Sequence, residues 1–184
     1  MSKTLEQFTR GASEPRAWMQ AGNDLLKAAW LIWDSKFAEA FGTLPKGYRG
    51  IPSELFDPFF LLAGFGLENL LKGLRVHQLL RGKQTIVLLG QGKLTTDLVT
   101  HDLTKLAKNT DIHPLLSHGE RGILRRLTLM TKWAGRYPVE RTFTGELNPR
   151  LLVSTDRRDI ESIVNYIRAA EKEFWIVHRS TPIH

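Results

Sequence analysis

The side chains whose spacing best suits chemistry are Glu68 and Lys72, four residues apart in an otherwise apolar stretch. On a helix, a glutamate placed four residues before a lysine lies on the same face in the favourable order for an ion pair. A buried carboxylate needs partners, so the simpler interpretation is a structural pair in which Glu68 also reaches a neighbouring helix. The sharper hypothesis is a polar cavity that Glu68 lines with His101 or His77, giving a polar core of Glu68, Lys72 and His101.

Histidine is the side chain best suited to proton transfer near neutral pH, and His101 is followed directly by Asp102. An acid–base dyad is one interpretation of this pair. Neighbouring residues on a helix point in different directions, which favours a role at the start of a helix instead. We expect no metal site and no cofactor, because no two histidines stand at i, i+4 on a predicted helix. This spacing is absent among His77, His113, His118 and His178.

Basic residues recur along a predicted helix in the second half of the chain. Four of them fall close to one face: Arg121, Arg125, Lys132 and Arg136. A charged stripe of this kind is usually a solvated surface. The functional alternative is a surface that follows the phosphates of RNA, DNA or a nucleotide. Loop aromatic residues that could stack on bases are few, so the sequence does not indicate base-specific recognition.

The composition is that of an ordinary globular chain with an excess of positive charge. The 184 residues include 26 Lys and Arg against 19 Asp and Glu, a net charge of +7, which permits an acidic partner without requiring one. There is no cysteine, which excludes disulfides, thiolate metal sites and cysteine nucleophiles. The polar N-terminus lacks the apolar core of a signal peptide, and the most apolar stretch is too short to span a bilayer. We therefore expect a cytoplasmic protein with no membrane association.

The glutamate–lysine pair must be held by an apolar helix over residues 57–82. An Asp-Pro pair is typical of a helix start, and Gly82 is suited to a left-handed cap at the end. Residues 59–67 carry no charge and are apolar on every side, so this helix should be buried all round at the centre of a bundle. Three glycines within it should let neighbouring helices approach closely.

Four further helices follow from apolar spacing and from signals at their ends. Thr100 should cap the short second one, and Ser117 with Glu120 fits a capping box at the start of the third. The expected helices cover residues 15–41, 101–109, 117–134 and 155–177.

These elements predict an all-α fold, an up-and-down bundle of four long helices plus one short helix. A flexible arm over residues 1–13 should precede a single bundle domain over 14–178, and a tail over 179–184 should follow it. Residues 42–56 form a connection rich in glycine and proline. The stretch 83–99 is the least certain, because its apolar run fits either a short strand or a helical turn.

Three landmarks, in this order, give the chain a resemblance to a known superfamily. They are an apolar helix with Gly66-Leu-Glu-Asn-Leu-Leu-Lys72, a short helix that opens with His101-Asp-Leu103, and a helix that ends with Trp133-Ala-Gly-Arg-Tyr-Pro138. Over residues 15–178 the set resembles the HEPN superfamily, helical bundles found in prokaryotic toxin–antitoxin and phage-defence systems. The resemblance implies an HEPN-like bundle that pairs as a homodimer.

Active members of that superfamily look like metal-independent ribonucleases with an arginine, four to six further residues and then a histidine at a dimer interface. The histidine would shuttle the proton of the ribose 2′-hydroxyl while the arginine stabilises the developing charge. In this chain only Arg179-Ser-Thr-Pro-Ile-His184 has the spacing. It lies beyond the last helix, where a frayed tail does not hold a catalytic pair in register. We therefore expect the chain to lack the motif.

Two functions follow as hypotheses. The preferred one is a non-enzymatic HEPN-like interaction or ligand-binding module of a phage-defence or toxin–antitoxin system, which binds a partner, nucleic acid or a nucleotide through its basic face. The candidate partners are RNA, a nucleotide and an operon-encoded protein. The alternative is a ribonuclease whose site is assembled atypically across a dimer, from Arg136 with His101 or His178.

Overall fold

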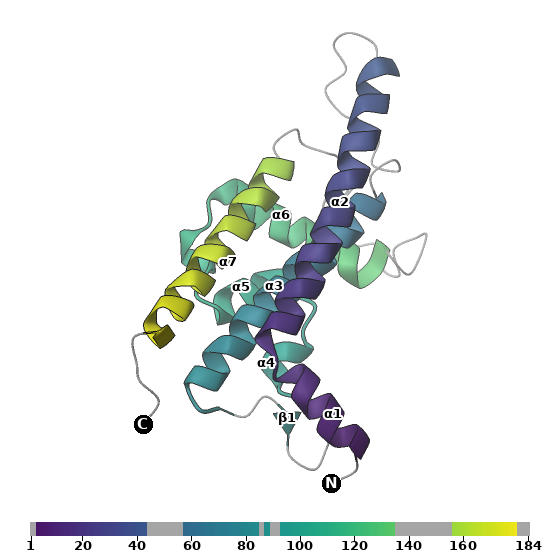
Figure 1. Cartoon of the computed structure of the whole chain (residues 1–184). Helices are drawn as coiled ribbons and strands as arrows, with labels where there is room; N and C mark the ends of the chain where they lie inside the picture. Colours follow the sequence, from purple (N-terminus) through teal and green to yellow (C-terminus); the bar gives the residue numbers. More distant parts are fainter. Residues whose placement is uncertain (1–2, 44–56, 85–86, 89–92, 135–155, 180–184) are drawn as a thin grey trace.

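The protein is all-α, as the sequence predicts. The computed structural model describes residues 3–43, 57–84, 87–88, 93–134 and 156–179 (Figure 1). The helices are α1 (Lys3–Ala12), α2 (Pro15–Thr43), α3 (Asp57–Arg81), α4 (Thr96–Val99), α5 (Leu103–Asn109), α6 (His118–Leu129) and α7 (Asp156–Arg179). A 3₁₀ turn, η2 (His113–Leu115), precedes α6, and a π-helical turn, η3 (Met130–Ala134), follows it. Strands β1 (Val87–Leu88) and β2 (Lys93–Leu94) form a two-residue antiparallel pair, so the stretch left open between strand and helix contains a strand.

Helix α3 is the centre of the structure, and its predicted burial is confirmed. It packs against α2, α5, α6, α7 and η3, and Figure 1 shows it crossing behind α2. Its side chains Leu67, Leu71 and Leu74 are fully excluded from solvent. A helix that touches neighbours on all sides has no polar face to offer, which explains the absence of charge along its first half.

The longest contact of α3 is with α2, and two glycines set its closeness. A Cβ atom added to Gly22 would lie 2.8 Å from the carbonyl oxygen of Gly66, and one added to Gly66 would lie 3.2 Å from that of Gly22. The two backbones therefore meet directly at this crossing. The prediction that glycines of the central helix admit close neighbours is confirmed here.

The N-terminal segment differs from the loose arm expected over residues 1–13, because residues 3–12 form α1. Its end is attached to the body of the protein. The Nε1–H of Trp18 donates to the carbonyl oxygen of Ala12 at 3.0 Å, and Ala12 is buried beside Val76, Leu79 and Leu98. The apolar spacing of so short a helix is weak evidence on its own, and the contacts that support it come from α3 and α4.

Two helix ends are formed by residues other than those predicted. Gly82 still donates its N–H to Gln78 at 3.0 Å, as a helical residue does, and Lys83 has the positive φ of 53°. The expected N-cap Thr100 instead ends α4, and the side chain of Asp102 caps α5 by accepting from the N–H of Lys105. Lysine in the left-handed region is uncommon, which is why glycine was the stronger sequence signal.

Helix α6 begins as predicted, with a capping box. Ser117 accepts from the N–H of Glu120, and Glu120 accepts from the N–H of Ser117 at 2.6 Å. Hydrogen bonds from Ser162 and Ser117 outweigh the opposing effect of burial and hold the pKa of Glu120 below its ordinary value. The helix does not continue as α-helix to residue 134, because η3 replaces its last turn.

Helix α7 starts at Asp156, within the predicted range, and Asp156 forms a buried ion pair with Arg126 of α6. Of its predicted apolar stripe, Ile160, Ile163 and Ile167 are fully buried. Among the described residues, none of the helices combines the length and apolarity needed to cross a membrane.

We predict that Gly22→Ala lowers the free energy of unfolding by about 1–3 kcal/mol, because the new methyl group would overpack the α2–α3 crossing. Gly122→Ala is the matched control: it lies in helix α6, where an added Cβ atom would meet nothing within 4 Å. That variant should be stabilised by up to about 1 kcal/mol through helix propensity. Urea unfolding of the two variants measures the difference, and an equally stable Gly22→Ala would contradict the direct backbone contact.

Candidate functional site

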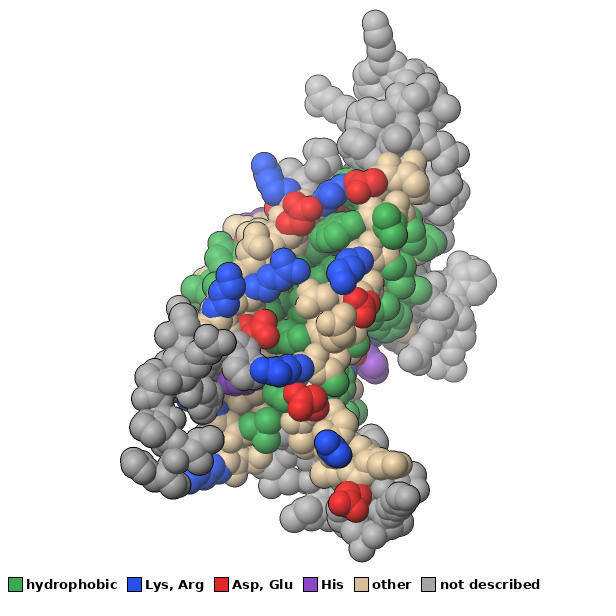
Figure 2. Space-filling view, in the orientation of Figure 1, with side chains coloured by type: hydrophobic (Ala, Val, Ile, Leu, Met, Phe, Trp, Pro, Cys, Tyr) green, Lys and Arg blue, Asp and Glu red, His purple; other side chains and the backbone are tan. Residues whose placement is uncertain are grey.

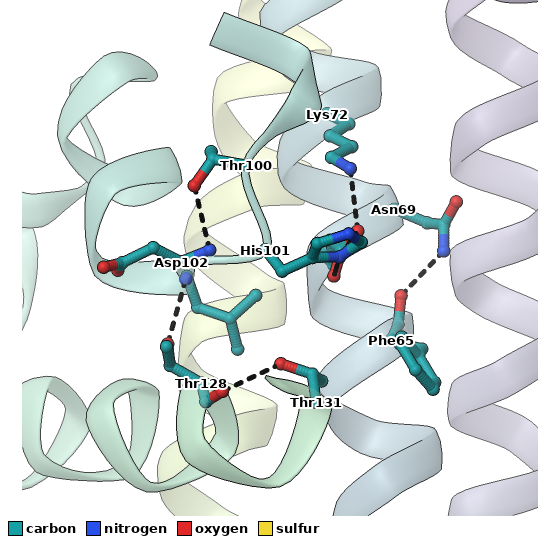
Figure 3. Close-up of polar contacts among 10 residues, drawn as sticks. Phe65, Asn69, Lys72, Thr100, His101, Asp102, Thr128 and Thr131 are labelled. Carbon is teal, nitrogen blue, oxygen red and sulfur yellow. Dashed lines mark hydrogen bonds and ion pairs between the residues drawn. The ribbon is translucent and has the colours of Figure 1, made fainter. Parts of the chain in front are cut away.

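A buried carboxylate, Glu68, joins a lysine and a histidine from different parts of the chain. The Nζ of Lys72 lies 2.7 Å from its Oε1, and the Nδ1 of His101 lies 3.0 Å from Oε1 and 3.1 Å from Oε2. The side chains of Glu68 and Lys72 are each only 7% exposed, whereas that of His101 is 47% exposed. Figure 3 shows Lys72 approaching this point from its own helix above and His101 from the link beside it. The cluster of Glu68, Lys72 and His101 therefore runs from the core to the surface.

The lysine reaches this position because of its own helix and the one beside it. Glu68 and Lys72 stand four residues apart on α3, so they lie on one face of the helix. The Nζ of Lys72 also lies 5.9 Å from the ring centre of Trp18 on α2, within the range of a cation–π contact. A lysine this deeply buried is held by two favourable contacts in place of water.

The histidine is held by the short link between α4 and α5. Asp102 donates its N–H to the Thr100 hydroxyl at 3.1 Å, and Leu103 donates its N–H to the Thr128 hydroxyl at 3.0 Å. Figure 3 shows both bonds beside His101. Hydrogen bonds within the link and to α6 therefore hold the backbone next to His101, which places the imidazole ring against Glu68.

This arrangement orients the imidazole. An ionised carboxylate only accepts hydrogen bonds, so beside an ionised Glu68 the Nδ1 atom of His101 is the donor of this contact. In the neutral ring the other nitrogen, Nε2, is then the acceptor. A carboxylate that fixes the tautomer of a histidine in this way is the arrangement that supports general-base chemistry.

The structure thus brings together the predicted polar core. His101, rather than His77, is the histidine that contacts Glu68, since residue 77 lies nine positions further along α3, about 13 Å away along the helix. The sequence favoured a helix-start role over a His101–Asp102 dyad, and Asp102 has that role: its side chain caps α5, and its Oδ2 lies 3.7 Å from the Nζ of Lys132.

The predicted basic face is brought together only in part. Arg121 and Arg125 are neighbours on α6, and the Nε–H of Arg125 donates to the Arg121 carbonyl at 3.4 Å. Lys132 forms the ion pair with Asp102. Arg136 and the side chain of His178 lie outside the described residues. Of the three catalytic candidates, only His101 is placed by the structure.

The fold adds basic residues that the sequence stripe missed. Helices α5 and α6 run antiparallel, because the start of α5 bonds to Thr128 near the end of α6, while His113 after α5 lies close to Arg121. Partial burial, then the positive charges of Arg121 and Lys108, hold the pKa of His113 below its ordinary value. We call the surface formed by Lys105, Lys108, His113, Arg121 and Arg125 the basic hairpin. Two lysines three residues apart in a short helix were the signal for it, but only the hairpin turn unites them with α6.

Among the described residues, no three His, Asp or Glu side chains gather as ligands for a metal ion. Comparisons of the chain with known protein families, with characterised proteins and with solved structures give no match. The likeness to the HEPN superfamily therefore stays a prediction from the three sequence landmarks.

We predict that Glu68→Gln lowers the free energy of unfolding by about 3–5 kcal/mol, because it leaves the buried Lys72 cation without a counter-charge. The double variant Glu68→Gln/Lys72→Met removes both charges and should recover part of that loss. Chemical unfolding of Glu68→Gln, of Lys72→Met and of the double variant gives the coupling free energy between the two side chains. Strictly additive losses would mean that the pair contributes no interaction of its own.

Proposed function

We propose that the protein is a non-enzymatic, HEPN-like binding module that binds RNA through the basic hairpin. The observation that carries the proposal is that Arg121 and Lys108 lie close enough to His113 for their positive charges to lower its pKa. Charges of one sign gathered on one surface attract a ligand of the opposite sign. A phosphate backbone is the common polyanion with closely spaced charges.

Among the described residues, no Asp or Glu forms an ion pair with Lys105, Lys108, Arg121 or Arg125. Three arginines elsewhere are paired with acidic groups: Arg75 with Asp97 at 2.6 Å, Arg126 with Asp156, and Arg157 with Asp34 and Glu161. Between residues 103 and 129 the carboxylates are Asp111 and Glu120, and Glu120 is held in the capping box with Ser117. Four permanent cations of the hairpin are therefore available to phosphates.

The chemistry of the hairpin also indicates what kind of RNA binding to expect. Residues 103–129 contain no Phe, Trp or Tyr, so no aromatic side chain of the hairpin stacks on a base. Lysine and arginine contacts to phosphates carry little sequence information. We therefore propose binding that depends on charge and is tolerant of sequence. Membership of a toxin–antitoxin or phage-defence system, and an operon-encoded partner, follow from the HEPN resemblance alone.

A second candidate function is favoured by the Glu68–His101 contact. A histidine whose tautomer is fixed by a carboxylate and whose ring is half exposed can accept the proton of a ribose 2′-hydroxyl. In this alternative the protein is a metal-independent ribonuclease. Its charge-stabilising arginine would be Arg136 of a paired copy, since no described arginine contacts His101.

We predict that the logarithm of the binding constant for single-stranded RNA falls with the logarithm of the salt concentration with a slope of about −3. Each of the four cations neutralises one phosphate, and each neutralised phosphate contributes about −0.7 to that slope. Lys108→Gln/Arg121→Gln should reduce the slope to about −1.4, whereas the matched control Arg10→Gln/Lys93→Gln should leave it unchanged. Fluorescence anisotropy of labelled RNA across a salt series measures the slopes. Equal slopes for the two double variants would contradict binding through the basic hairpin.

The same mixtures, kept in EDTA and run on a denaturing gel, separate the two candidates. A binding module leaves the RNA intact. Cleavage with 2′,3′-cyclic ends that is lost in His101→Ala would establish the ribonuclease instead.

We also predict that RNA binding raises the pKa of His113. Phosphates would offset the charges of Arg121 and Lys108, which lower that pKa in the free protein. A pKa that rises on binding means that a proton is taken up, so affinity should increase as the pH falls through the window between the free and bound values. NMR titration of the imidazole signals with and without RNA measures both values. An unchanged pKa in the saturated complex would place the RNA elsewhere.

A further inference from the structure

A groove lies between α2 and α7, on the face shown in Figure 2. Its volume is about 550 Å³, within the range of about 300–1,000 Å³ that is typical of small-molecule sites. Leu26 and Val164 are 3% and 5% exposed and form its floor with the half-buried Trp30. In Figure 2, hydrophobic side chains are visible between charged side chains on this face. The floor can therefore receive the apolar body of a ligand.

Polar contacts join the two helices near both ends of the groove. Arg157 of α7 forms an ion pair with Asp34 of α2 at one end. At the other end, the Nη2 of Arg168 donates to the Oδ1 of Asn23 at 3.1 Å. From the helical rise, the two contacts are about 16 Å apart along the helices. A length of this size suits a small molecule, whereas a longer polypeptide segment laid along the groove would have to cross both contacts.

The cation at the first end is already used by the protein. Arg157 pairs with Asp34, and its Nε lies 2.9 Å from the Oε1 of Glu161, which lines the groove. Its guanidinium carbon also lies 5.2 Å from the ring centre of Trp30, within the range of a cation–π contact. Two carboxylates and one aromatic face therefore surround this arginine, which leaves it no positive charge to offer a ligand.

The cation at the other end has no such partner. Among the described residues, Arg168 bonds to the neutral amide of Asn23 and forms no ion pair with an Asp or Glu. A guanidinium group has five N–H donors, and this hydrogen bond uses one of them. Asn165 also lines the groove, and its side-chain amide has two donors of its own. Donors suited to an anion are thus available beside the apolar floor.

The other cation that lines the groove, Lys27, is balanced by a neighbouring carboxylate. Its Nζ lies 3.2 Å from the Oδ1 of Asp24. Hydrogen bonds from Gln20 and Lys27 hold the pKa of Asp24 below its ordinary value, so this carboxyl group is ionised at neutral pH. Arg168 is therefore the lining cation whose charge the described carboxylates leave for a ligand.

We propose that the α2–α7 groove binds a small carboxylic acid, whose carboxylate accepts hydrogen bonds from Arg168 and Asn165 while its apolar body covers Leu26 and Val164. The planar guanidinium group matches a carboxylate with two parallel hydrogen bonds. One cation balances one carboxylate, whereas a phosphate monoester carries a charge of about −1.5 to −2 at pH 7. The groove belongs to α2 and α7, so it is separate from the basic hairpin and from the proposed RNA binding.

The test compares three probes that share a phenylbutyl body: 4-phenylbutyrate, 4-phenylbutanol and 4-phenylbutylamine. They are anionic, neutral and cationic at neutral pH. NMR titration of the full chain follows binding through the methyl signals of Leu26 and Val164. A Kd of about 1 mM is expected for 4-phenylbutyrate from its size. The alcohol and the amine should bind about tenfold more weakly, because they lose the hydrogen bonds between two charged groups.

A variant of the proposed anchor tests its role. Arg168→Gln should weaken the binding of 4-phenylbutyrate about tenfold and remove its preference over 4-phenylbutanol. The side chain of Arg168 is exposed, so the substitution leaves the core unchanged. Arg158→Gln is the matched control, because Arg158 is exposed on the same helix but does not line the groove. This variant should bind 4-phenylbutyrate as the wild type does.

Three results would overturn the inference. The first is the absence of shifts at Leu26 and Val164 on addition of 4-phenylbutyrate. The second is equal affinity for the three probes, and the third is an Arg168→Gln variant that binds 4-phenylbutyrate as tightly as Arg158→Gln does. None of these results depends on whether RNA binds to the basic hairpin.

Discussion

The polar architecture of this protein depends on the burial of one carboxylate. Glu68 is placed on the most buried helix, where an isolated charge is strongly unfavourable. Lys72 and His101 supply the partners that the carboxylate needs, and Trp18 supplies a second contact to the lysine. These contacts come from α2, α3 and the link before α5. Because the buried carboxylate of Glu68 needs charged and hydrogen-bonding partners, three segments of the chain meet around it.

The close crossing of α2 and α3 complements that cluster. Gly22 and Gly66 bring the two backbones into contact, which lets Trp18 of α2 reach the lysine one and a half turns further along α3. A larger residue at the crossing would separate the helices on the side where the cation–π contact is made. Packing of small residues and burial of charge are therefore linked within the same pair of helices.

The features of the fold that depend on the spacing of residues close together in the sequence could be predicted. The capping box of Ser117 and Glu120, the buried stripe of α7 and the all-round burial of α3 each follow from spacing alone. The pair Glu68–Lys72 was also predictable, because helical geometry fixes it. Three features were not predicted: Lys83 as the left-handed residue, Asp102 as the cap, and the π-helical turn at residues 130–134. Lysine is uncommon in the left-handed region, so local propensity favoured Gly82, and the cap and the π-helical turn leave no distinct signal in the sequence.

The candidate site shows the same division. That Glu68 would need a partner from another helix followed from the cost of a buried charge, but the sequence left both His101 and His77 open. The backbone bonds of Asp102 and Leu103 decided it. The basic hairpin was even harder to predict from the sequence. Lys108 and Arg121 are thirteen positions apart in the sequence, and only the turn between α5 and α6 brings both close to His113.

The positions of these two clusters bear on the choice between the candidate functions. His101 precedes α5, whereas Lys108, His113 and Arg121 gather at its other end, and a seven-residue helix is about 10 Å long. Near His101, the described cation Lys132 already faces Asp102, and Lys72 is buried against Glu68. Phosphoryl transfer needs a charge-stabilising group beside the proton acceptor. Among the described residues no arginine or lysine forms a hydrogen bond with His101, and the absence of a charge-stabilising group at that ring is the physical reason to prefer binding over cleavage.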